Sequence, residues 1–252
     1  IDIPNTVDVI GTGAFYKCIY ASGHLHIPDS VTRIGDYAFQ GCSALTSISI
    51  GQNLTSIGNT AFAQCTNLSG NLTLPDSLLT IGASAFTSCS NLISVKMPKN
   101  INTISKYLFA GCSKLISVEN ASNITSIETF AFSGCTKLKQ FIIPDSVTSI
   151  EAYAFRECEG LTSIVIPDSV TSISHGTFYG CRRLTSIVIP DSVTSIDVAT
   201  FNECSGLTSI NIPDSVTSIE RMAFYRCSGL TDVVIPDSVT SIGEEAFYVC
   251  SG

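Results

Sequence analysis

The sequence predicts a solenoid of about eleven 23-residue coils, with a parallel β-sheet on its concave face and short turns or helical segments on its convex face. The eleven cysteines follow one another at gaps of 23 or 24 residues. A Phe stands three positions before each cysteine, as Phe155 does before Cys158. The stretch from Leu161 to Ile173 recurs letter for letter at 184–196. A fixed period of this length is typical of repeat architectures.

The first element of each coil is a short strand. Leu161, Ile164 and Ile166 follow the spacing L-x-x-L-x-L that opens a leucine-rich repeat, and alternate side chains of a strand point to one side. Residues 167–169, Pro-Asp-Ser, end the strand, because proline has no N–H for the ladder and Asp-Ser favours a turn. We therefore expect one inward-facing strand in every coil.

Two further elements close the coil. Val170 and Ile173 return to the core and predict a second short strand. Ala154, Phe155 and Cys158 lie at positions i, i+1 and i+4, which favours a helical or 3₁₀ turn. A single coil then has too few inward residues to be stable alone, so the coils must stack on one another.

Stacking at the ~4.8 Å spacing of paired strands brings identical residues into ladders. The predicted structural ladder includes Phe155, Cys158, Phe178, Cys181, Phe201 and Cys204. Stacked cysteines lie within the Cα distance range of a disulfide, but an odd number cannot all pair. Because every cysteine has the same apolar setting, we expect free, buried thiols.

The run I-P-D-S-V-T-S-I-G-x-x-A-F-x-x-C-x-x-L resembles the BspA-like leucine-rich repeat of bacterial surface proteins, which also occurs in some mucosal protozoan parasites. The resemblance covers the whole chain, 1–252, as a single solenoid domain. It implies a curved solenoid that is displayed at the cell surface or secreted and serves in adhesion. Segments 51–53 and 120–122 replace the proline turn, and Lys99-Asn100 replaces Asp-Ser. The Asn ladder of common leucine-rich repeats is missing, and residues such as Ser169 stand near that position.

Both ends of the sequence are ragged. Ile1 begins in mid-strand, and the chain stops at Ser251-Gly252, where the next Leu is due. A solenoid needs polar caps over its terminal coils, so we expect this chain to be part of a longer protein that carries any signal or anchor. Uncapped ends would also allow self-association.

The composition excludes several classes of partner. The net charge of −8 argues against nucleic-acid binding, which needs clustered Lys and Arg. No apolar run is long enough to enter a membrane as a span, and no signal peptide opens the chain. Only 13% of residues are charged, so hydroxyls cover much of the surface.

No catalytic residue, cofactor or metal site is predicted. Serines and carboxylates repeat with the period, whereas catalysis needs a unique convergent site. His24 and His26 share one side of a strand but have no third ligand, so we interpret them as surface residues. An acidic column occupies the turn at Asp29, Asp76, Asp145, Asp168, Asp191, Asp214 and Asp237. Asp suits this turn, and a bound cation that relieves the repulsion is the alternative.

Two surfaces are candidates for partner binding. The outward strand positions on the concave face are Lys96, Glu119, Ile142, Val165, Val188, Asn211 and Val234. Ile142, Val165 and Val188 predict an exposed apolar strip bordered by hydroxyls, although β-propensity alone also explains Val in a strand. A second edge collects Arg156, Tyr179, Arg182, Arg183, Tyr225 and Arg226, of the residue types that dominate interfaces.

Two functions fit these features. The first is a non-catalytic binding module for an extracellular protein or glycan, and the second is a structural spacer that presents another domain. Near-identical copies from Leu161 onward favour a spacer, and the varied copies before Ala121 favour recognition. The family resemblance favours adhesion.

Overall fold

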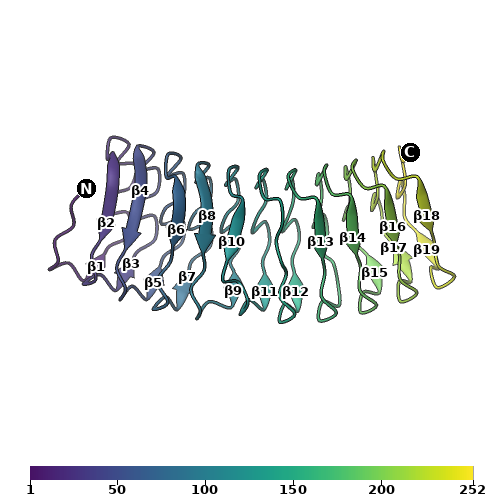
Figure 1. Ribbon diagram of the computed structural model, residues 1–252, viewed down its shortest axis with the longest axis horizontal. Helices are drawn as coiled ribbons and strands as arrows, with labels where there is room; N and C mark the ends of the chain where they lie inside the picture. Colours follow the sequence, from purple (N-terminus) through teal and green to yellow (C-terminus); the bar gives the residue numbers. More distant parts are fainter. Residues whose placement is uncertain (252) are drawn as a thin grey trace. The chain divides into compact units, whose positions relative to one another are not determined.

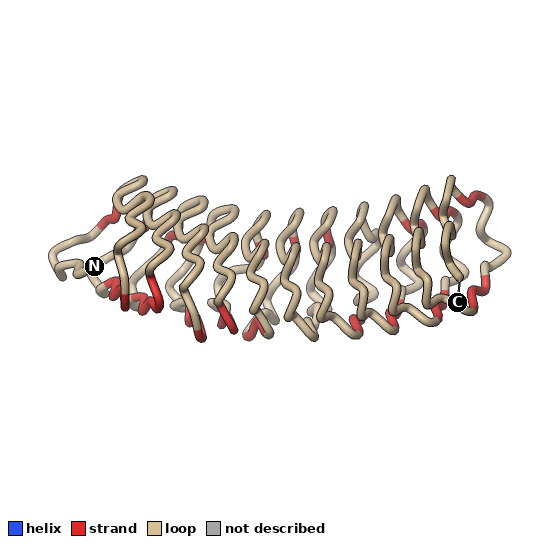
Figure 2. The backbone as a smooth tube through the Cα atoms, turned by 90° about the horizontal axis from the view of Figure 1, so that it is seen from above, coloured by secondary structure: helices blue, strands red, loops and turns tan. Residues whose placement is uncertain are grey.

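The computed structural model describes residues 1–251 and resolves the chain into two compact units, Ile1–Asn123 and Ile124–Gly252. Each unit is a stack of coils in which parallel strands of successive coils lie side by side (Figures 1 and 2). Residues 1–251 contain no helix, and hence none that could cross a membrane. The prediction of one domain over 1–252 includes Gly252, which lies outside the described residues, and it stays a prediction.

One row of longer strands lines each unit and is called here the long-strand face. In the first unit it consists of β2 (Gly23–Ile27), β4 (Leu45–Ile50), β6 (Gly70–Thr73), β8 (Leu92–Lys96) and β10 (Ser117–Glu119). In the second unit it consists of β13 (Ser163–Val165), β14 (Ser186–Val188), β16 (Ser209–Asn211) and β18 (Asp232–Val234). The predicted parallel sheet is confirmed.

A second row of two-residue strands forms the short-strand face. The first unit contributes β1 (Val9–Ile10), β3 (Arg33–Ile34), β5 (Ser56–Ile57), β7 (Thr80–Ile81) and β9 (Thr103–Ile104). The second contributes β11 (Ser126–Ile127), β12 (Ser149–Ile150), β15 (Ser195–Ile196), β17 (Ser218–Ile219) and β19 (Ser241–Ile242). Ile173 joins this row through parallel bridges to Ile150 and Ile196, which confirms the predicted second strand.

The alternation of side chains follows the predicted period. In β13 the side chain of Ile164 is buried, whereas Ser163 and Val165 are exposed. Val170 and Ile173 are buried on the other side of the same coil. A turn connects the two strands, and in it the N–H of Val170 donates to the carbonyl of Pro167 at 3.0 Å. Each coil therefore closes around an apolar interior.

The turn that contains Phe155 and Cys158, called here the Phe turn, is a series of tight turns and not a helix. Its N–H groups at Tyr153, Phe155 and Glu157 donate to carbonyls of the next coil at 2.7–3.0 Å. The N–H groups between them donate to carbonyls three residues back in the chain. Tyr153 and Glu157 have positive φ values of 58° and 56°, which interrupt any helix. The sequence predicts either short turns or helical segments here, and the structure has turns.

The Phe side chains form the predicted ladder within each unit. Centroids of neighbouring rings lie 5.0–6.2 Å apart in the first unit and 5.0–5.7 Å apart in the second. The widest gap separates Phe86 from Phe109, where Leu108 replaces the Ala that precedes Phe in most copies. Gaps of 5.7 Å flank Phe178, which follows Thr177. The largest side chain at this position, Leu108, therefore accompanies the widest of these spacings.

Serine and asparagine share one ladder that joins the coils at the Pro-Asp-Ser turn. The hydroxyl of Ser192 donates to the carbonyl of Val170 in the preceding coil at 2.6 Å. The side-chain amide of Asn53 donates to the carbonyl of Asp29 at 3.0 Å. The serine bond, to the apolar residue after the preceding turn, recurs at Ser77, Ser146, Ser169, Ser215 and Ser238. The longer asparagine side chain bonds to the carbonyl two positions earlier, and this bond recurs at Asn100 and Asn123. Serine therefore takes the place of the missing Asn in most coils.

One coil of the second unit lacks the long strand. Residues 139–143 have no strand assignment, and Phe141 occupies the position that Ile164 has in the next coil. The Phe141 ring tilts by 48° against both Phe132 and Phe155, with centroids 5.0 and 5.7 Å away. A larger ring thus replaces the Ile at this position, and the paired long strands of the second unit begin at β13.

Replacing Phe155 by Ala should lower the free energy of unfolding by about 3–5 kcal/mol, because it removes a fully buried ring from the ladder. It should also split the urea transition of the second unit, since each coil contacts only its neighbours. Circular dichroism during urea unfolding measures both effects. Ile142→Ala, at a side chain that is 85% exposed, is the control. A Phe155→Ala protein with the parental midpoint would contradict the ladder.

Replacing Gln64 by Gly should raise stability by about 0.5–1 kcal/mol, because Gln64 is held at a φ of 60° that glycine adopts without strain. Gly41 and Gly111 occupy the same position in other coils, at φ values of 73° and 72°. The measurement is the urea midpoint. The adjacent Ala63→Gly is the matched control, and it should be destabilising. Equal destabilisation by both substitutions would contradict this account of the turn.

Candidate binding surfaces

The long-strand face of the second unit carries the predicted apolar strip. Ile142, Val165 and Val188 are 85%, 63% and 59% exposed. Val165 and Val188 are register partners in β13 and β14. The hydroxyls of Ser163 and Ser186, register partners in the same strands, border them and are exposed. The predicted strip is therefore present as a surface of branched apolar side chains beside a row of hydroxyls.

The residue equivalent to Val165 is polar or charged in several other coils. In the second unit Asn211 pairs in register with Val234, and both are exposed. In the first unit Lys96 on β8 pairs with Glu119 on β10, so opposite charges follow one another on exposed positions. The structure thus brings the predicted outward residues to the long-strand face of their own unit, as an opposite-charge pair in the first unit and as Val side chains together with Asn211 in the second.

A small polar cluster lies on the long-strand face at β2 and β4. His24 and His26 are both exposed on this face, as predicted. The ring nitrogens of His24 lie 2.8 Å from the Ser47 hydroxyl and 2.9 Å from the Ser49 hydroxyl. The Nδ1 atom of His26 lies 2.9 Å from the same Ser49 hydroxyl. Among residues 1–251 no group of three or more His, Cys, Asp or Glu side chains is arranged to hold a metal ion.

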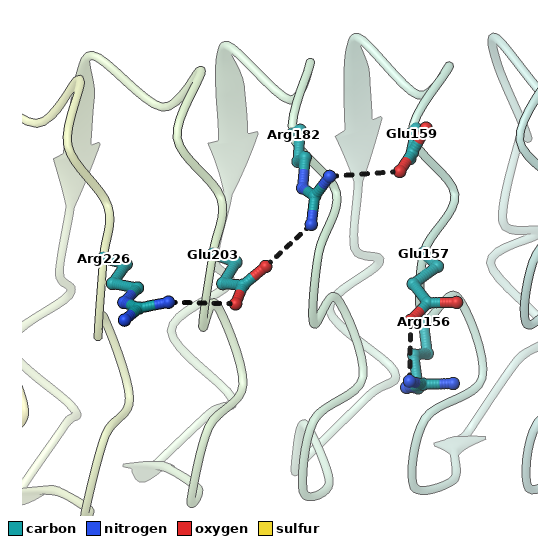
Figure 3. A network of polar contacts seen from close by, with 6 residues as sticks. All are labelled: Arg156, Glu157, Glu159, Arg182, Glu203 and Arg226. Atoms are coloured by element: carbon teal, nitrogen blue, oxygen red, sulfur yellow. Dashed lines mark hydrogen bonds and ion pairs between the residues drawn. The ribbon is translucent and has the colours of Figure 1, made fainter.

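The second predicted edge contains a chain of ion pairs at the Phe turns of the second unit (Figure 3). The Arg182 guanidinium lies 2.9 Å from a Glu203 carboxylate oxygen and 3.5 Å from Glu159. Arg226 approaches the other Glu203 oxygen at 3.8 Å. Glu203 therefore lies between two arginines, one from the preceding coil and one from the following coil. Arg156 forms a separate pair with Glu157 at 2.6 Å.

Tyrosine rings continue this edge. The Arg156 guanidinium lies over the Tyr179 ring at 5.5 Å from its centroid, and Arg226 lies over Tyr225 at 5.2 Å. The Tyr225 ring stacks on Tyr248 with centroids 5.3 Å apart. Such cation–π and stacking contacts hold long side chains in defined positions. Burial, and then the Glu203 carboxylate, raise the pKa of Tyr179, so its hydroxyl remains a hydrogen-bond donor at neutral pH.

A hollow of about 380 Å³ lies beside the ion pairs and is called here the edge hollow. It is lined by Arg182, Glu203, Ser205, Arg226, Ser228 and Val249. The hydrogen bond to Glu203 raises the pKa of the Arg182 guanidinium, so that side chain stays charged. Arg183 is exposed but lies outside this network. The hollow thus combines guanidinium donors, a carboxylate acceptor and hydroxyls.

Sequence reasoning identified the arginines and tyrosines of this edge but missed its glutamates. These glutamates occupy the same positions in their coils as the arginines do in neighbouring coils. Glu157 and Glu203 directly precede a cysteine, and Glu159 directly follows one. The sequence does contain a sign of this pairing, because acidic and basic residues alternate there at spacings of 21–23 positions. Stacking of the coils brings such residues into contact. Charges that are distant in sequence therefore neutralise one another in space.

The cysteines are free, and nine of the eleven are fully buried. Buried thiols along the ladder donate to the carbonyl of a Phe in the preceding coil, as Cys65 does to Phe39 at 3.3 Å and Cys181 to Phe155 at 3.2 Å. Burial raises the pKa of Cys42 to about 11 and that of Cys181 to about 12, and it raises those of Cys89, Cys158 and Cys204 well above the ordinary value. A thiol that stays protonated is a poor nucleophile and metal ligand, so this ladder is structural.

The acidic column has a structural role in the first unit. A carboxylate oxygen of Asp29 accepts the backbone N–H of Gln52 in the next coil at 2.6 Å. Asp76 accepts the N–H of Lys99 at 3.1 Å and forms an ion pair with its ammonium at 3.0 Å. The Lys99 side chain and backbone lower the pKa of Asp76. These aspartates fix the turn of the following coil.

Comparison with known proteins places this geometry among bacterial repeat proteins. A family described as the BspA type leucine-rich repeat region, in six copies, matches residues 1–70, 69–183 and 125–252. A leucine-rich repeat protein from Bacteroides ovatus is 33% identical, with a TM-score of 0.77, and the match covers 99% of this chain and 70% of that one. No curated protein matches the chain.

Two further solved structures are similar. A leucine-rich cell surface protein from Faecalibacterium prausnitzii is 30% identical, with a TM-score of 0.56, over 97% of this chain and 81% of that one. The leucine-rich repeat protein of T. pallidum is 26% identical, with a TM-score of 0.53, over 73% of this chain and 77% of that one.

The buried thiols predict loss of stability at high pH. An unfolded thiol ionises near pH 9, whereas folded Cys181 keeps its proton until about pH 12. Between these values the unfolded state binds fewer protons, so stability falls as pH rises, by up to about 1.4 kcal/mol per pH unit for each buried thiol. Urea midpoints between pH 9.5 and 11 should fall less steeply for Cys181→Ala than for the parent. Cys18→Ala, at an exposed thiol, is the control, and an unchanged slope in Cys181→Ala would contradict the assignment.

Proposed function

Because the chain belongs to the BspA type leucine-rich repeat family, we propose that it is a non-catalytic, surface-displayed binding module that adheres to an extracellular protein through the long-strand face of its second unit. The observation that carries this proposal is the apolar strip of Ile142, Val165 and Val188, whose side chains are 59–85% exposed. Display at the cell surface is supported by the similar protein from Faecalibacterium prausnitzii, which is described as a cell surface protein.

The chemistry of the strip favours a protein partner. Burying one exposed Val or Ile side chain against a partner contributes about 1.5–3 kcal/mol, so three such side chains supply the apolar centre of an interface. The bordering hydroxyls of Ser163 and Ser186 are exposed and can make hydrogen bonds to a partner at the rim. They carry no charge, so burying them with a hydrogen-bond partner costs less than burying an ionised group. A partner with an exposed apolar patch fits this surface.

The distribution of reactive groups supports a non-catalytic role. Catalysis needs a unique, convergent set of groups, whereas the thiols here repeat in a buried ladder with raised pKa values. The hydroxyl of Ser49 lies between His24 and His26 on an open strand face, where nothing in that cluster excludes water. Such a cluster suits hydrogen bonding to a partner.

A spacer is the second candidate, and one observation favours it. The coils from Leu161 onward are nearly identical and pair in strict register, as Ser163–Val165 does with Ser186–Val188. Uniform coils set length without selecting a ligand. The outward column nevertheless changes from Val188 to Asn211 between neighbouring coils, a difference that a spacer does not need.

A double substitution tests the binding face. The chain should bind saturably to at least one member of a panel of immobilised fibronectin, laminin and collagen at physiological salt. Val165→Asp with Val188→Asp should weaken that binding at least tenfold, because two charges enter the apolar centre of the interface. Surface plasmon resonance measures the affinity, and thermal melting verifies the fold.

The matched control is Thr171→Asp with Thr194→Asp, at exposed positions of the same two coils beside the short-strand face. This variant should bind like the parent. Absence of saturable binding across the panel would favour the spacer, and equal loss in both double variants would contradict the choice of face.

A further inference from the structure

We propose that the edge hollow is a second binding site, separate from the long-strand face, and that its ligand is a neutral carbohydrate. Its lining comes from the Phe turns of successive coils, through Arg182, Glu203 and Arg226, with the hydroxyls of Ser205 and Ser228. Its volume of about 380 Å³ falls within the roughly 300–1,000 Å³ of small-molecule sites and fits a short saccharide.

The order of charges selects against ionic ligands. Glu203 already pairs with Arg182 at 2.9 Å and with Arg226 at 3.8 Å. An anion would have to displace the carboxylate from the arginines, and a cation would face two guanidinium groups. A sugar hydroxyl both donates and accepts, whereas a guanidinium only donates and a carboxylate only accepts. Vicinal hydroxyls can therefore bond to Arg226 and Glu203 together without breaking their pair.

Val249 supplies the apolar part of the lining, and its side chain is 48% exposed. The C–H face of a sugar ring can pack against it while the sugar hydroxyls reach the charged groups. The tyrosines lie outside the lining and support Arg226: its guanidinium lies over the Tyr225 ring, which stacks on Tyr248 with centroids 5.3 Å apart. Arg226 is therefore held in position before a ligand binds.

The test is isothermal titration calorimetry of the whole chain with maltohexaose, cellohexaose, xylohexaose and mannohexaose, and with heparin as the anionic probe. At least one neutral oligosaccharide should bind saturably, with an affinity that is unchanged between 0.15 and 1 M NaCl. Arg226→Ala and Arg182→Ala should each weaken this binding about tenfold or more, since a charge-assisted hydrogen bond is lost. The exposed Arg221→Ala, in the same coil as Arg226, is the matched control and should bind like the parent.

Glu203→Gln distinguishes the ligand classes. It should weaken the binding of a neutral sugar, because the carboxylate acceptor is lost. It would strengthen the binding of an anion, because the competing negative charge is removed. Binding of heparin alone, stronger in Glu203→Gln and lost in 1 M NaCl, would overturn the proposal. So would the absence of binding by all four neutral sugars, or binding that survives both arginine substitutions. None of these residues belongs to the strip of Ile142, Val165 and Val188, so matrix-protein binding by each variant reports separately on the long-strand face.

Discussion

Backbone hydrogen bonds between successive Phe turns are the constraint on which the rest of the structure depends. Alternate N–H groups of each turn, such as those of Phe155 and Glu157, donate to the next coil, so each turn must match its neighbour atom for atom. The bonds hold neighbouring Phe rings 5.0–6.2 Å apart within a unit and set buried thiols such as that of Cys181 against a Phe carbonyl. A residue inserted inside this turn would break the match, and the two 24-residue gaps fall outside it.

The same register determines how the surface is organised. Residues that are 23 positions apart become neighbours in space. Residues at the same position of successive coils therefore form a continuous row on the surface. Uniform columns give the threonine and serine rows, which add stability without selecting a ligand. Columns that vary create local chemistry, namely the Ile142–Val188 strip and the Arg182–Glu203–Arg226 group. The proposed recognition therefore depends on departures from the repeat, while stability depends on the repeat itself.

The ladder residues could be predicted from sequence because they obey a strict period. The burial of Ile164 and Phe155 and the exposure of Val165 follow directly from it. The backbone of the Phe turn could not be predicted, because non-glycine residues such as Tyr153 adopt positive φ only under the constraint of neighbouring coils. The pairing of Glu203 with arginines depends on side-chain reach across coils, and the absence of a strand at 139–143 interrupts a column that is otherwise regular. Neither is visible in a one-dimensional pattern.

Trapping the register with engineered disulfides tests this account most directly. Ser163 and Ser186 are exposed register partners, and paired strands lie within the Cα range of roughly 4.4–6.8 Å that a disulfide needs. Ser163→Cys with Ser186→Cys should cross-link under mild oxidation, as detected by peptide mass spectrometry. Ser163→Cys with Val188→Cys, displaced by two residues along the strand to roughly 8 Å, should not. Cross-linking of the displaced pair in preference to the aligned one would contradict the register and every surface derived from it.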